Sequence, residues 1–377
     1  MIDRKIVISR DMTGFSSDFA LYEDGKIRTC HNFSDDDIVY GSTSFNQGEL
    51  LDIAGSIGMN ICSFVDDALL SSYAQIYGQK INWARALGKS KFVSTINSTL
   101  RNISKELEEK DEKRYLSTLI KGRKTLGSFS RACVDQRALT DELKKRESSN
   151  LNSLLSNEPG VCEIVRYSHA SQTGRMTVTN GPKVLLLSKE DRRFFVPSNS
   201  DNVLAQVDFV SLEPRVVYLL ARGEAPRDIY TKMGEEIGGD TSRAKLKIAT
   251  ISSLYGSSKV DPAITKKISR FFSIDKLTEK YLNDERLFNL YGRPLSPEDE
   301  RLRLSHFVQS TAVDVALLGF SDFVASFDII PYFMIHDSLV FECSKEIYEQ
   351  LSNQDLYIDV ERIGRFYLGL SKFNEHI

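Results

Sequence analysis

Short apolar runs alternate with amphipathic stretches along the second half of the chain, from about Val161 onward. Two of the apolar runs, 203–207 and 332–341, are rich in β-branched and aromatic residues, which is typical of buried strands. Two other stretches, 212–222 and 243–255, have apolar residues at helical spacing and end next to a glycine, a common helix stop. The pattern predicts an α+β body over this part of the chain.

The first residues follow a different pattern. Residues 1–45 predict a small β-rich segment that includes a strand at Lys5–Ser9 and a hairpin around Asp24–Gly25. The polar and acidic stretch Asn32–Gln47 is expected to be a linker.

Residues 46–160 have helical apolar spacing and no proline before Pro159, which predicts a helical region. Within it, the segment 101–146 holds 13 Lys and Arg residues against 8 Asp and Glu residues. The local cluster that contains Lys121 and Lys124 has the charge to grip nucleic-acid phosphates. A solvated helical face is the alternative interpretation of the same pattern.

Bulk properties set limits on the protein class. A chain of 377 residues with 41% hydrophobic and 27% charged residues suits a soluble protein of two or three domains. The net charge of −3 gives no global sign of nucleic-acid binding, although an acidic back can offset a basic cleft. Five scattered cysteines, no signal-peptide core and no apolar run that could span a bilayer predict a reduced, cytoplasmic protein without a membrane partner.

Asp208 ends the first apolar run and lies just before a predicted helix. Ser211 is a plausible N-cap of that helix, and Pro214 is tolerable within its first turn. Backbone N–H groups at such a point can face an anion, while the carboxylate can face a cation. An ordinary aspartate in a strand-to-helix turn is the alternative.

Four residues recur at every fourth position of the second predicted helix: Arg243, Lys247, Ile251 and Tyr255. They form one slowly drifting stripe, with its two cations in the half where the helix dipole adds positive potential. Such a stripe can bind a triphosphate at one end and support a base at the other. An exposed basic face would explain the two cations, but it explains the apolar residue and the tyrosine less well.

Asp337 interrupts the second apolar run. A charge among buried strands is costly unless it is paired or bound to metal, although His-Asp-Ser is also an acceptable tight turn. Two carboxylates brought close raise each other's proton affinity, and a divalent cation removes that conflict. We therefore expect Asp208 and Asp337 to pair through metal.

Several short motifs together resemble the polymerase domain of family A, or DNA polymerase I-like, DNA polymerases. In chain order they are Thr173-Gly174-Arg175, then Asp208 with Glu213 and Arg215, then Arg243 and Lys247 with Tyr255-Gly256, then Gln309 to Asp314, and finally His336-Asp337. The resemblance covers about Tyr167 to Ile377. Because chance matches would also have to fall in this order, the set is more specific than any single motif.

The resemblance implies a right-hand polymerase, with an antiparallel sheet in the palm and helical fingers and thumb. The palm would span 161–377, the fingers would be inserted at about 223–300, and the helical region 46–160 would act as the thumb. The segment 1–45 has no assigned role.

The resemblance also implies two-metal catalysis with two Mg²⁺ ions, for which Mn²⁺ is a candidate substitute. The implied metal ligands are Asp208, Asp337 and the backbone carbonyl of Phe209. Lys247 would hold the triphosphate and protonate the leaving pyrophosphate.

Substrate contacts follow from the same likeness. The implied nucleotide-binding residues are Ser211, Glu213, Arg243, Lys247, Ile251 and Tyr255, and the implied DNA contacts are Lys121, Lys124, Arg175, Arg301, Gln309 and His336. Glu213 would block a ribose 2′-hydroxyl and so select deoxynucleotides. The alternatives are an acidic first-turn residue for Glu213, a loop cation for Arg175 and helix-surface residues for Arg301 and Gln309.

The chain departs from the family pattern at several positions. Ile251 stands where the family usually has Phe or Tyr, which leaves nucleotide stacking and sugar discrimination open. Val210 and Ser338 replace the usual Ser and Glu. This divergence in a small chain suggests a phage or mobile element as the source.

The sequence thus predicts a template-directed DNA polymerase that adds dNTPs to a primer 3′ end. No Asp-x-Glu exonuclease start occurs in residues 1–160, so we expect no 3′–5′ exonuclease. The alternatives are a single-subunit RNA polymerase-like enzyme and a catalytically degenerate replisome scaffold. The expected partners are primer–template DNA and dNTPs, with replisome proteins as further candidates, and the protein is expected to be a monomer.

Overall fold

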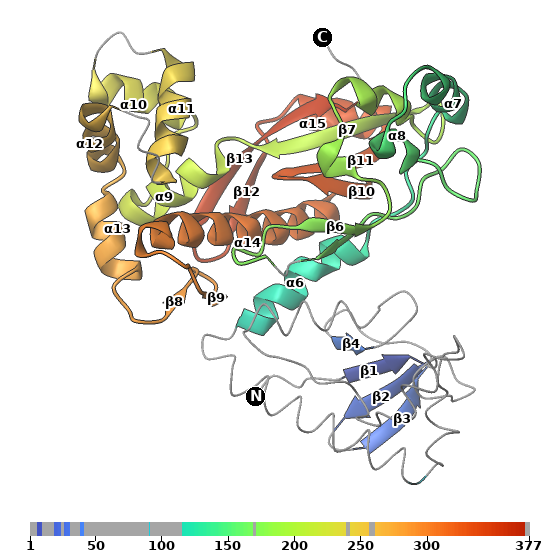
Figure 1. Cartoon of the computed structure of the whole chain (residues 1–377), viewed down its shortest axis with the longest axis horizontal. Helices are drawn as coiled ribbons and strands as arrows, with labels where there is room; N and C mark the ends of the chain where they lie inside the picture. The colour runs from blue at the N-terminus through green and yellow to red at the C-terminus, as the bar shows by residue number, and fades with distance from the viewer. Residues whose placement is uncertain are drawn as a thin grey trace. The chain divides into compact units, whose positions relative to one another are not determined.

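Figure 1 shows the computed structural model of the chain. It describes the backbone of strands at 6–9, 19–23, 26–30 and 38–40, the single residue 90, and residues 115–373 apart from 169–170, 239–241 and 256–260. The chain divides into two compact units, Met1–Ile120 and Lys121–Ile377, which are described separately below.

The first unit contains a four-stranded sheet in the order β3-β2-β1-β4. Its strands are β1 (Ile6–Ser9), β2 (Phe19–Glu23), β3 (Lys26–Cys30) and β4 (Ile38–Tyr40). β2 and β3 pair antiparallel with Glu23 opposite Lys26, as the predicted hairpin requires. β4 lies inside the expected linker and pairs parallel with β1. The linker expectation was therefore wrong for Ile38–Tyr40, whose β-branched and aromatic residues favour a strand.

A five-stranded antiparallel sheet in the order β10-β11-β7-β13-β12 forms the centre of the second unit. Its strands are β7 (Asn202–Phe209), β10 (Ile330–Ile335), β11 (Ser338–Ser344), β12 (Tyr357–Val360) and β13 (Gly364–Lys372). Two small ladders accompany it, β5 (Arg166–Ser168) with β6 (Thr177–Asn180) and β8 (Leu287–Phe288) with β9 (Pro294–Leu295). The predicted first apolar run is the middle strand, which is paired on both sides.

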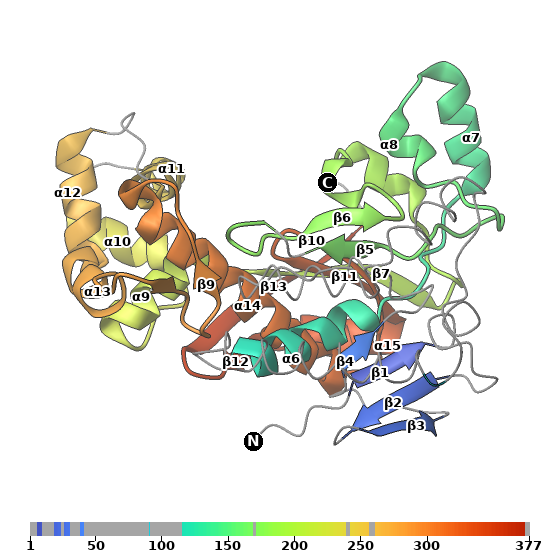
Figure 2. The same ribbon diagram turned by 60° about the horizontal axis from the view of Figure 1, so that its bottom comes forward.

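Helices surround this sheet. They are α6 (Tyr115–Gly127), α7 (Gln136–Lys145), α8 (Ser149–Asn152), α9 (Leu212–Arg222), α10 (Ile229–Ile237), α11 (Arg243–Leu254), α12 (Pro262–Phe271), α13 (Ile274–Tyr281), α14 (Arg303–Ser326) and α15 (Lys345–Ser352), with short 3₁₀ turns η1 (Val184–Leu186), η2 (Glu190–Phe194) and η3 (Glu300–Leu302). Figure 2 shows α10–α13 at one end of this unit and α7 and α8 at the other, with the sheet between them.

The longest helix, α14, packs against the middle strand. The rings of Phe320 and Phe209 lie 4.9 Å apart, and a Cβ at Gly319 would lie 3.0 Å from the edge of the Phe209 ring. By length and composition the stretch Glu300–Ser326 could cross a membrane, but 72% of its most apolar window is buried inside the protein, as in a core helix. This packing fixes the end of β7 that carries Asp208.

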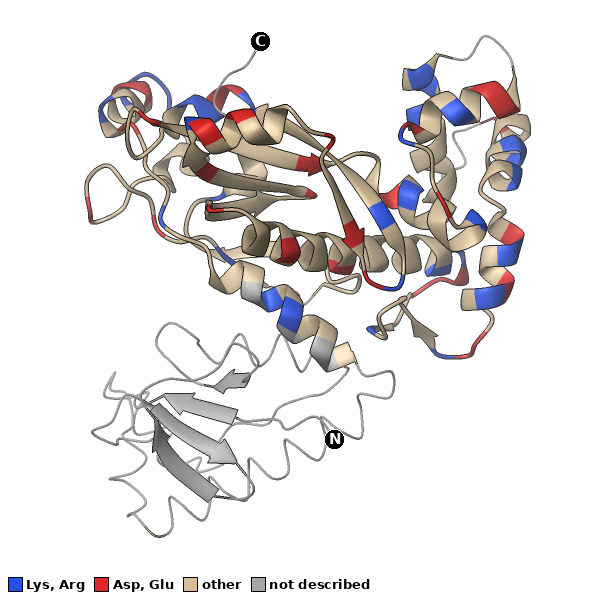
Figure 3. Ribbon diagram, turned by 180° about the vertical axis from the view of Figure 1, so that it is seen from behind, with Lys and Arg blue, Asp and Glu red and all other residues tan. Residues whose placement is uncertain are grey.

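The helices α10–α13 share one hydrophobic core, which we call the helical group. Buried residues from each of these helices meet there, among them Met233, Leu246, Phe271 and Leu277, and α9 contributes Val217. Basic and acidic positions are interspersed on the outside of the helical group (Figure 3). The helical group therefore has its own core and is joined to the sheet through α9 and α14.

The compact-unit boundary at Ile120 falls inside the segment 46–160 that was expected to form one helical region. Residues 46–114 of that segment, except residue 90, lie outside the described part of the chain. The thumb assignment and the exact domain limits therefore stay predictions.

Candidate active site

The register of the central sheet brings Asp208 and Asp337 together. Ser338 lies directly opposite Asp208 in the β11–β7 ladder, and the N–H of Phe209 donates to the carbonyl oxygen of Asp337 at 3.3 Å. The Ser338 hydroxyl donates to Oδ1 of Asp208 at 2.7 Å. Two acidic residues far apart in sequence therefore meet at one end of the sheet.

Asp337 occupies a tight turn, not the middle of a strand. β10 ends at Ile335 and β11 begins at Ser338, so His336 and Asp337 make the connection. His336 has a φ of 55°, in the left-handed region that is uncommon for residues other than glycine. The tight-turn interpretation is thus correct for the backbone, and this turn is what presents Asp337 to Asp208.

The two carboxylates carry excess negative charge. Burial raises the pKa of Asp208 to about 6, and the charge of Asp337 adds to the effect. Burial also raises the pKa of Asp337, with Glu213 contributing further. Unfavourable ionisation of this kind is relieved by a divalent cation.

The donor set fits a hard cation such as Mg²⁺. Among the described residues, no group of three or more His, Cys, Asp or Glu side chains could hold a metal, so this site offers two carboxylates. The ring of Phe209 is buried in the core, which leaves its backbone carbonyl as the group that could face a metal. Mg²⁺ commonly takes few carboxylates and completes its coordination with water and substrate phosphates.

The predicted stripe on α11 is divided between two kinds of partner. Arg243 forms an ion pair with Asp228 at 2.8 Å, and its guanidinium lies 5.4 Å from the Tyr230 ring centre. Lys247, one turn further on, lowers the pKa of both Asp208 and Asp337 through its charge. The charge of Lys247 therefore acts on both carboxylates, whereas Asp228 holds Arg243 in an ion pair.

Three further predicted residues gather near the carboxylate of Glu213, two of them in direct contact with it. The Tyr255 hydroxyl donates to Oε2 of Glu213 at 2.5 Å, and Nη2 of Arg175 lies 3.5 Å from Oε1 of the same residue. Gln309 forms a side-chain hydrogen bond with Tyr255. Burial and the bond to Glu213 raise the pKa of Tyr255, so the phenol stays protonated and continues to donate.

Ser211 does not cap α9 with its side chain, contrary to the sequence-based expectation. Its backbone is left-handed, with a φ of 57°, and the side chain makes no cap hydrogen bond. The hydroxyl instead bonds the side chain of Tyr230, whose pKa is raised to about 12, mainly by burial. Ser211 is thus drawn toward α10, beside Arg243.

Other predicted positions have partners of their own or are partly described. Arg301 pairs with Asp299 at 2.5 Å and is 87% exposed, and Lys121 pairs with Asp322 at 3.1 Å. Ile251 is half-buried on α11. Lys124 lies on α6, but its side chain is outside the described part of the structure.

His336 is exposed at the tip of the β10–β11 turn. Its pKa is lowered by partial burial and then by the charges of Arg175 and Arg192, which favours a neutral imidazole at physiological pH.

Sequence reasoning missed three residues beside this site: Asp228, Tyr230 and Arg192. Asp228 caps α10 by accepting from the N–H groups of Tyr230 and Thr231, a role that an aspartate before an apolar helix start could have indicated. Arg192, on η2, influences the pKa of Asp208, and no local motif marks it.

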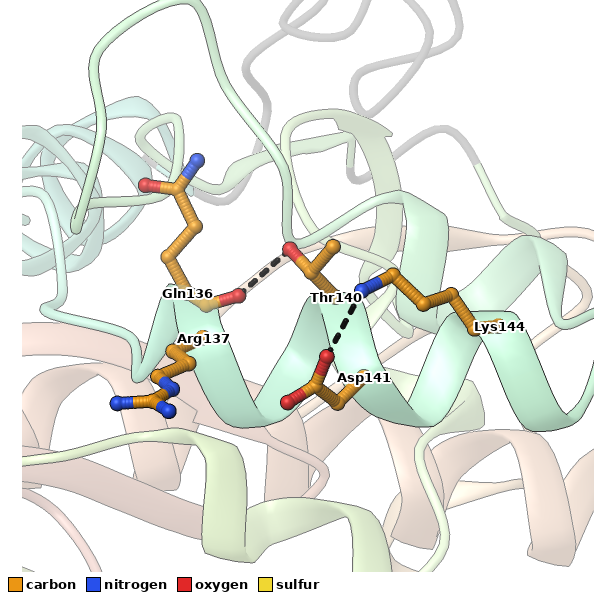
Figure 4. A pocket seen from close by; sticks show the side chains of 5 residues that line it. All are labelled: Gln136, Arg137, Thr140, Asp141 and Lys144. Carbon is orange, nitrogen blue, oxygen red and sulfur yellow. Dashed lines mark hydrogen bonds and ion pairs between the residues drawn. The ribbon is translucent and has the colours of Figure 1, made fainter.

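A surface hollow lies elsewhere, along α7 (Figure 4). It is lined by Gln136, Arg137, Thr140, Asp141 and Lys144. The Thr140 hydroxyl donates to the backbone oxygen of Gln136, and Lys144 pairs with Asp141 at 2.9 Å. All lining residues come from one helix, so this hollow does not look like a convergent binding site.

Comparison with known proteins supports the fold. No protein-family model matches the chain, and no curated protein matches its sequence. Among solved structures, it is similar to the POL domain of Pol1 from M. smegmatis, in complex with DNA primer-template and dNTP. The TM-score is 0.63 over 98% of this chain and 96% of that chain, at 12% identity. The chain thus has the fold of a DNA polymerase domain, and the predicted α+β polymerase fold is confirmed at this level.

Proposed function

We propose that this protein is a template-directed DNA polymerase of the family A type. It adds dNTPs to a primer 3′ end by two-metal-ion catalysis and has no 3′–5′ exonuclease. The observation that carries the proposal is the β11–β7 register, which sets the Asp337 turn against Asp208 in a polymerase fold. Lys247 supplies the adjacent cation.

In this proposal each residue has a separate task. Asp208 and Asp337 hold the metal ions, which when bound supply Lewis-acid activation of the primer hydroxyl and charge neutralisation for the leaving group. Lys247 binds the triphosphate and is placed to give a proton to the departing pyrophosphate. Arg243 binds the same triphosphate after releasing Asp228.

Nucleotide selection would depend on Glu213. Its carboxylate is 17% exposed and is held by Tyr255 and Arg175, so it cannot swing away without breaking both contacts. A side chain fixed in this way can exclude a ribose 2′-hydroxyl by both volume and charge. The sheet with α14 would be the palm, and the helical group would be the fingers.

The test is extension of a labelled primer annealed to a template, with dNTPs or NTPs and with Mg²⁺ or Mn²⁺. Wild type should extend with dNTPs, and Asp337→Ala should lose about 10³-fold or more in rate, because the metal ligands act in the transition state. Asp359→Asn is the matched control, since that carboxylate pairs with Arg365 on the neighbouring strand and should keep wild-type activity.

Other outcomes would overturn the proposal. Unprimed synthesis with NTPs from a double-stranded promoter would indicate an RNA polymerase-like enzyme. Normal primer–template binding without incorporation would indicate a scaffold. Degradation of a single-stranded primer end that is lost on Asp208→Ala would contradict the absence of an exonuclease.

A further inference from the structure

Arg192 lies on the same face of the sheet as Asp208. Its Nη1 donates to Oε1 of Gln206 at 3.4 Å, and its guanidinium stacks 5.1 Å from the Phe373 ring centre. Gln206 and Asp208 are two residues apart on β7, so their side chains share one face and lie about 7 Å apart. The guanidinium is therefore next to the carboxylate centre.

The hydrogen-bonding capacity of Arg192 is largely unused. Its Nε is buried, and no hydrogen-bond acceptor among the described residues reaches it. No acidic side chain in that part of the chain forms an ion pair with Arg192, whereas its neighbour Arg193 pairs with Glu142 at 3.2 Å. Because a partly buried guanidinium without a counter-ion is costly, an anionic ligand that reaches the Nη groups is the natural partner.

The position of Arg192 identifies which anion this would be. Asp208 is followed directly by α9 and the helical group that carries Lys247, while Gln206 lies two residues back toward the middle of the sheet. Arg192 and Lys247, whose charges both act on the pKa of Asp208, thus come from different elements, η2 and α11. In phosphoryl transfer the attacking and leaving oxygens are roughly in line on opposite sides of the phosphorus. If Lys247 attends the leaving group, Arg192 belongs to the attacking side.

We infer that Arg192 binds the phosphodiester of the primer strand that precedes the 3′-terminal nucleotide. Its Nη groups donate charge-assisted hydrogen bonds to the phosphate oxygens, while the Phe373 ring packs against the guanidinium. The contact positions the primer terminus beside Asp208 without reading sequence. This inference rests on the proposed function and adds a substrate contact to it.

The test measures equilibrium binding of a fluorescent primer–template duplex, without dNTP and without catalysis. Wild type and Arg192→Gln are each titrated with an ordinary primer and with one whose 3′-terminal linkage is a neutral methylphosphonate. We expect each single change to weaken Kd about tenfold, and the combination to cause no further loss. Arg192→Gln should also lower the slope of log Kd against log salt by about one.

Two variants serve as controls. Arg193→Gln removes the neighbouring cation, which pairs with Glu142 and lies over the Phe194 ring, and should keep wild-type sensitivity to the methylphosphonate. Arg192→Lys keeps the charge and should bind within about threefold of wild type, because a point charge still meets the phosphate. If the Gln variant folds poorly, wild type alone still tests the inference, because binding that the methylphosphonate leaves unchanged would overturn it.

If Arg192→Gln and the methylphosphonate together weaken DNA binding by the product of their separate effects, the inference is overturned. Unchanged affinity in Arg192→Gln would overturn it as well. A variant that only raises the Mg²⁺ requirement would show that Arg192 acts on Asp208 instead of on DNA. Failure of wild type to extend primers, together with non-multiplying losses, would refute the proposed catalysis but keep this contact. Normal primer extension by wild type, together with losses that multiply, would support the proposed catalysis but refute the Arg192 contact.

Discussion

The acidic and the basic halves of the proposed active site are held in place by different means. Asp208 and Asp337 are fixed by backbone pairing of β7 with β11, over a strand that packs on α14. Arg243 and Lys247 project from α11 as exposed side chains, and one of them is bound by Asp228. The acidic half is therefore preformed, whereas Arg243 in the basic half would have to leave Asp228 before it could bind the proposed substrate.

This difference has a simple physical origin. A one-residue slip in a sheet would turn every side chain to the other face, so a register with a buried face is strongly specified. An exposed ion pair contributes only about 0.2–1 kcal/mol, so a triphosphate can displace it. In the proposed mechanism, metal binding would benefit from the first property and substrate exchange from the second.

The largest expected effect within the basic half is at Lys247. Lys247→Ala should lower kcat/KM for dNTPs by about 10²-fold, because it removes a group that attends the leaving pyrophosphate. Lys245→Ala is the matched control: Lys245 is also exposed on α11 but lies outside the stripe, and its loss should change kcat/KM less than about twofold. Steady-state single-nucleotide incorporation measures both, and equal losses would show only a general charge effect.

A smaller effect is expected from releasing Arg243. Asp228→Asn retains an N-cap for α10 but removes the charge that pairs with Arg243. KM for dNTPs should fall about threefold with little change in kcat, because the cation no longer has to leave a protein partner. Single-nucleotide kinetics at low salt would measure this change. A rise in KM would mean that Asp228 orients Arg243 toward the substrate instead of competing for it.

The smallest effect concerns stability in the absence of metal. The pKa of Asp208 is raised to about 6 in the folded protein, so between about pH 4 and 6 the folded state binds more protons than the unfolded chain. Stability therefore falls as pH rises through this window, and because Asp208 is exposed, solvent screens part of the penalty that remains above pH 6.

Asp208→Asn removes that penalty and keeps an acceptor for Ser338. In EDTA its Tm should exceed the wild-type value by about 2 °C at neutral pH and match it at about pH 4. Thermal unfolding followed by circular dichroism would measure the difference, and added Mg²⁺ should narrow it by stabilising wild type. A difference that does not depend on pH would argue against carboxylate repulsion as its cause.

Local patterns predicted much of the framework. The apolar run 203–207 became β7, the glycine after Arg222 ends α9, and the stretch 243–255 with helical spacing became α11. The order of the motifs predicted the polymerase fold, which the structural comparison supports. These features are encoded within a few residues of chain, so a single sequence is enough to find them.

Long-range pairing accounts for what the sequence did not show. Ser211 takes a left-handed backbone with its hydroxyl bonded to Tyr230, and Arg243 pairs with Asp228 on another helix. The position of Arg192 depends on Gln206, which is in a different element. Neither spacing nor propensity encodes such contacts, because they arise only when separate elements pack together.

Another long-range pair lies beneath the loop that carries Arg175. Asp314 and Arg293 are each 2% exposed and 3.0 Å apart, and a Cβ at Gly174 would overlap the guanidinium of Arg293. Dissolved ions screen exposed charges but have little access to a buried pair. Raising the ionic strength should therefore weaken the proposed nucleic-acid contacts well before it separates Arg293 from Asp314 on α14. The loop that packs on Arg293 through Gly174 should then keep its position, and binding should return when the salt is removed.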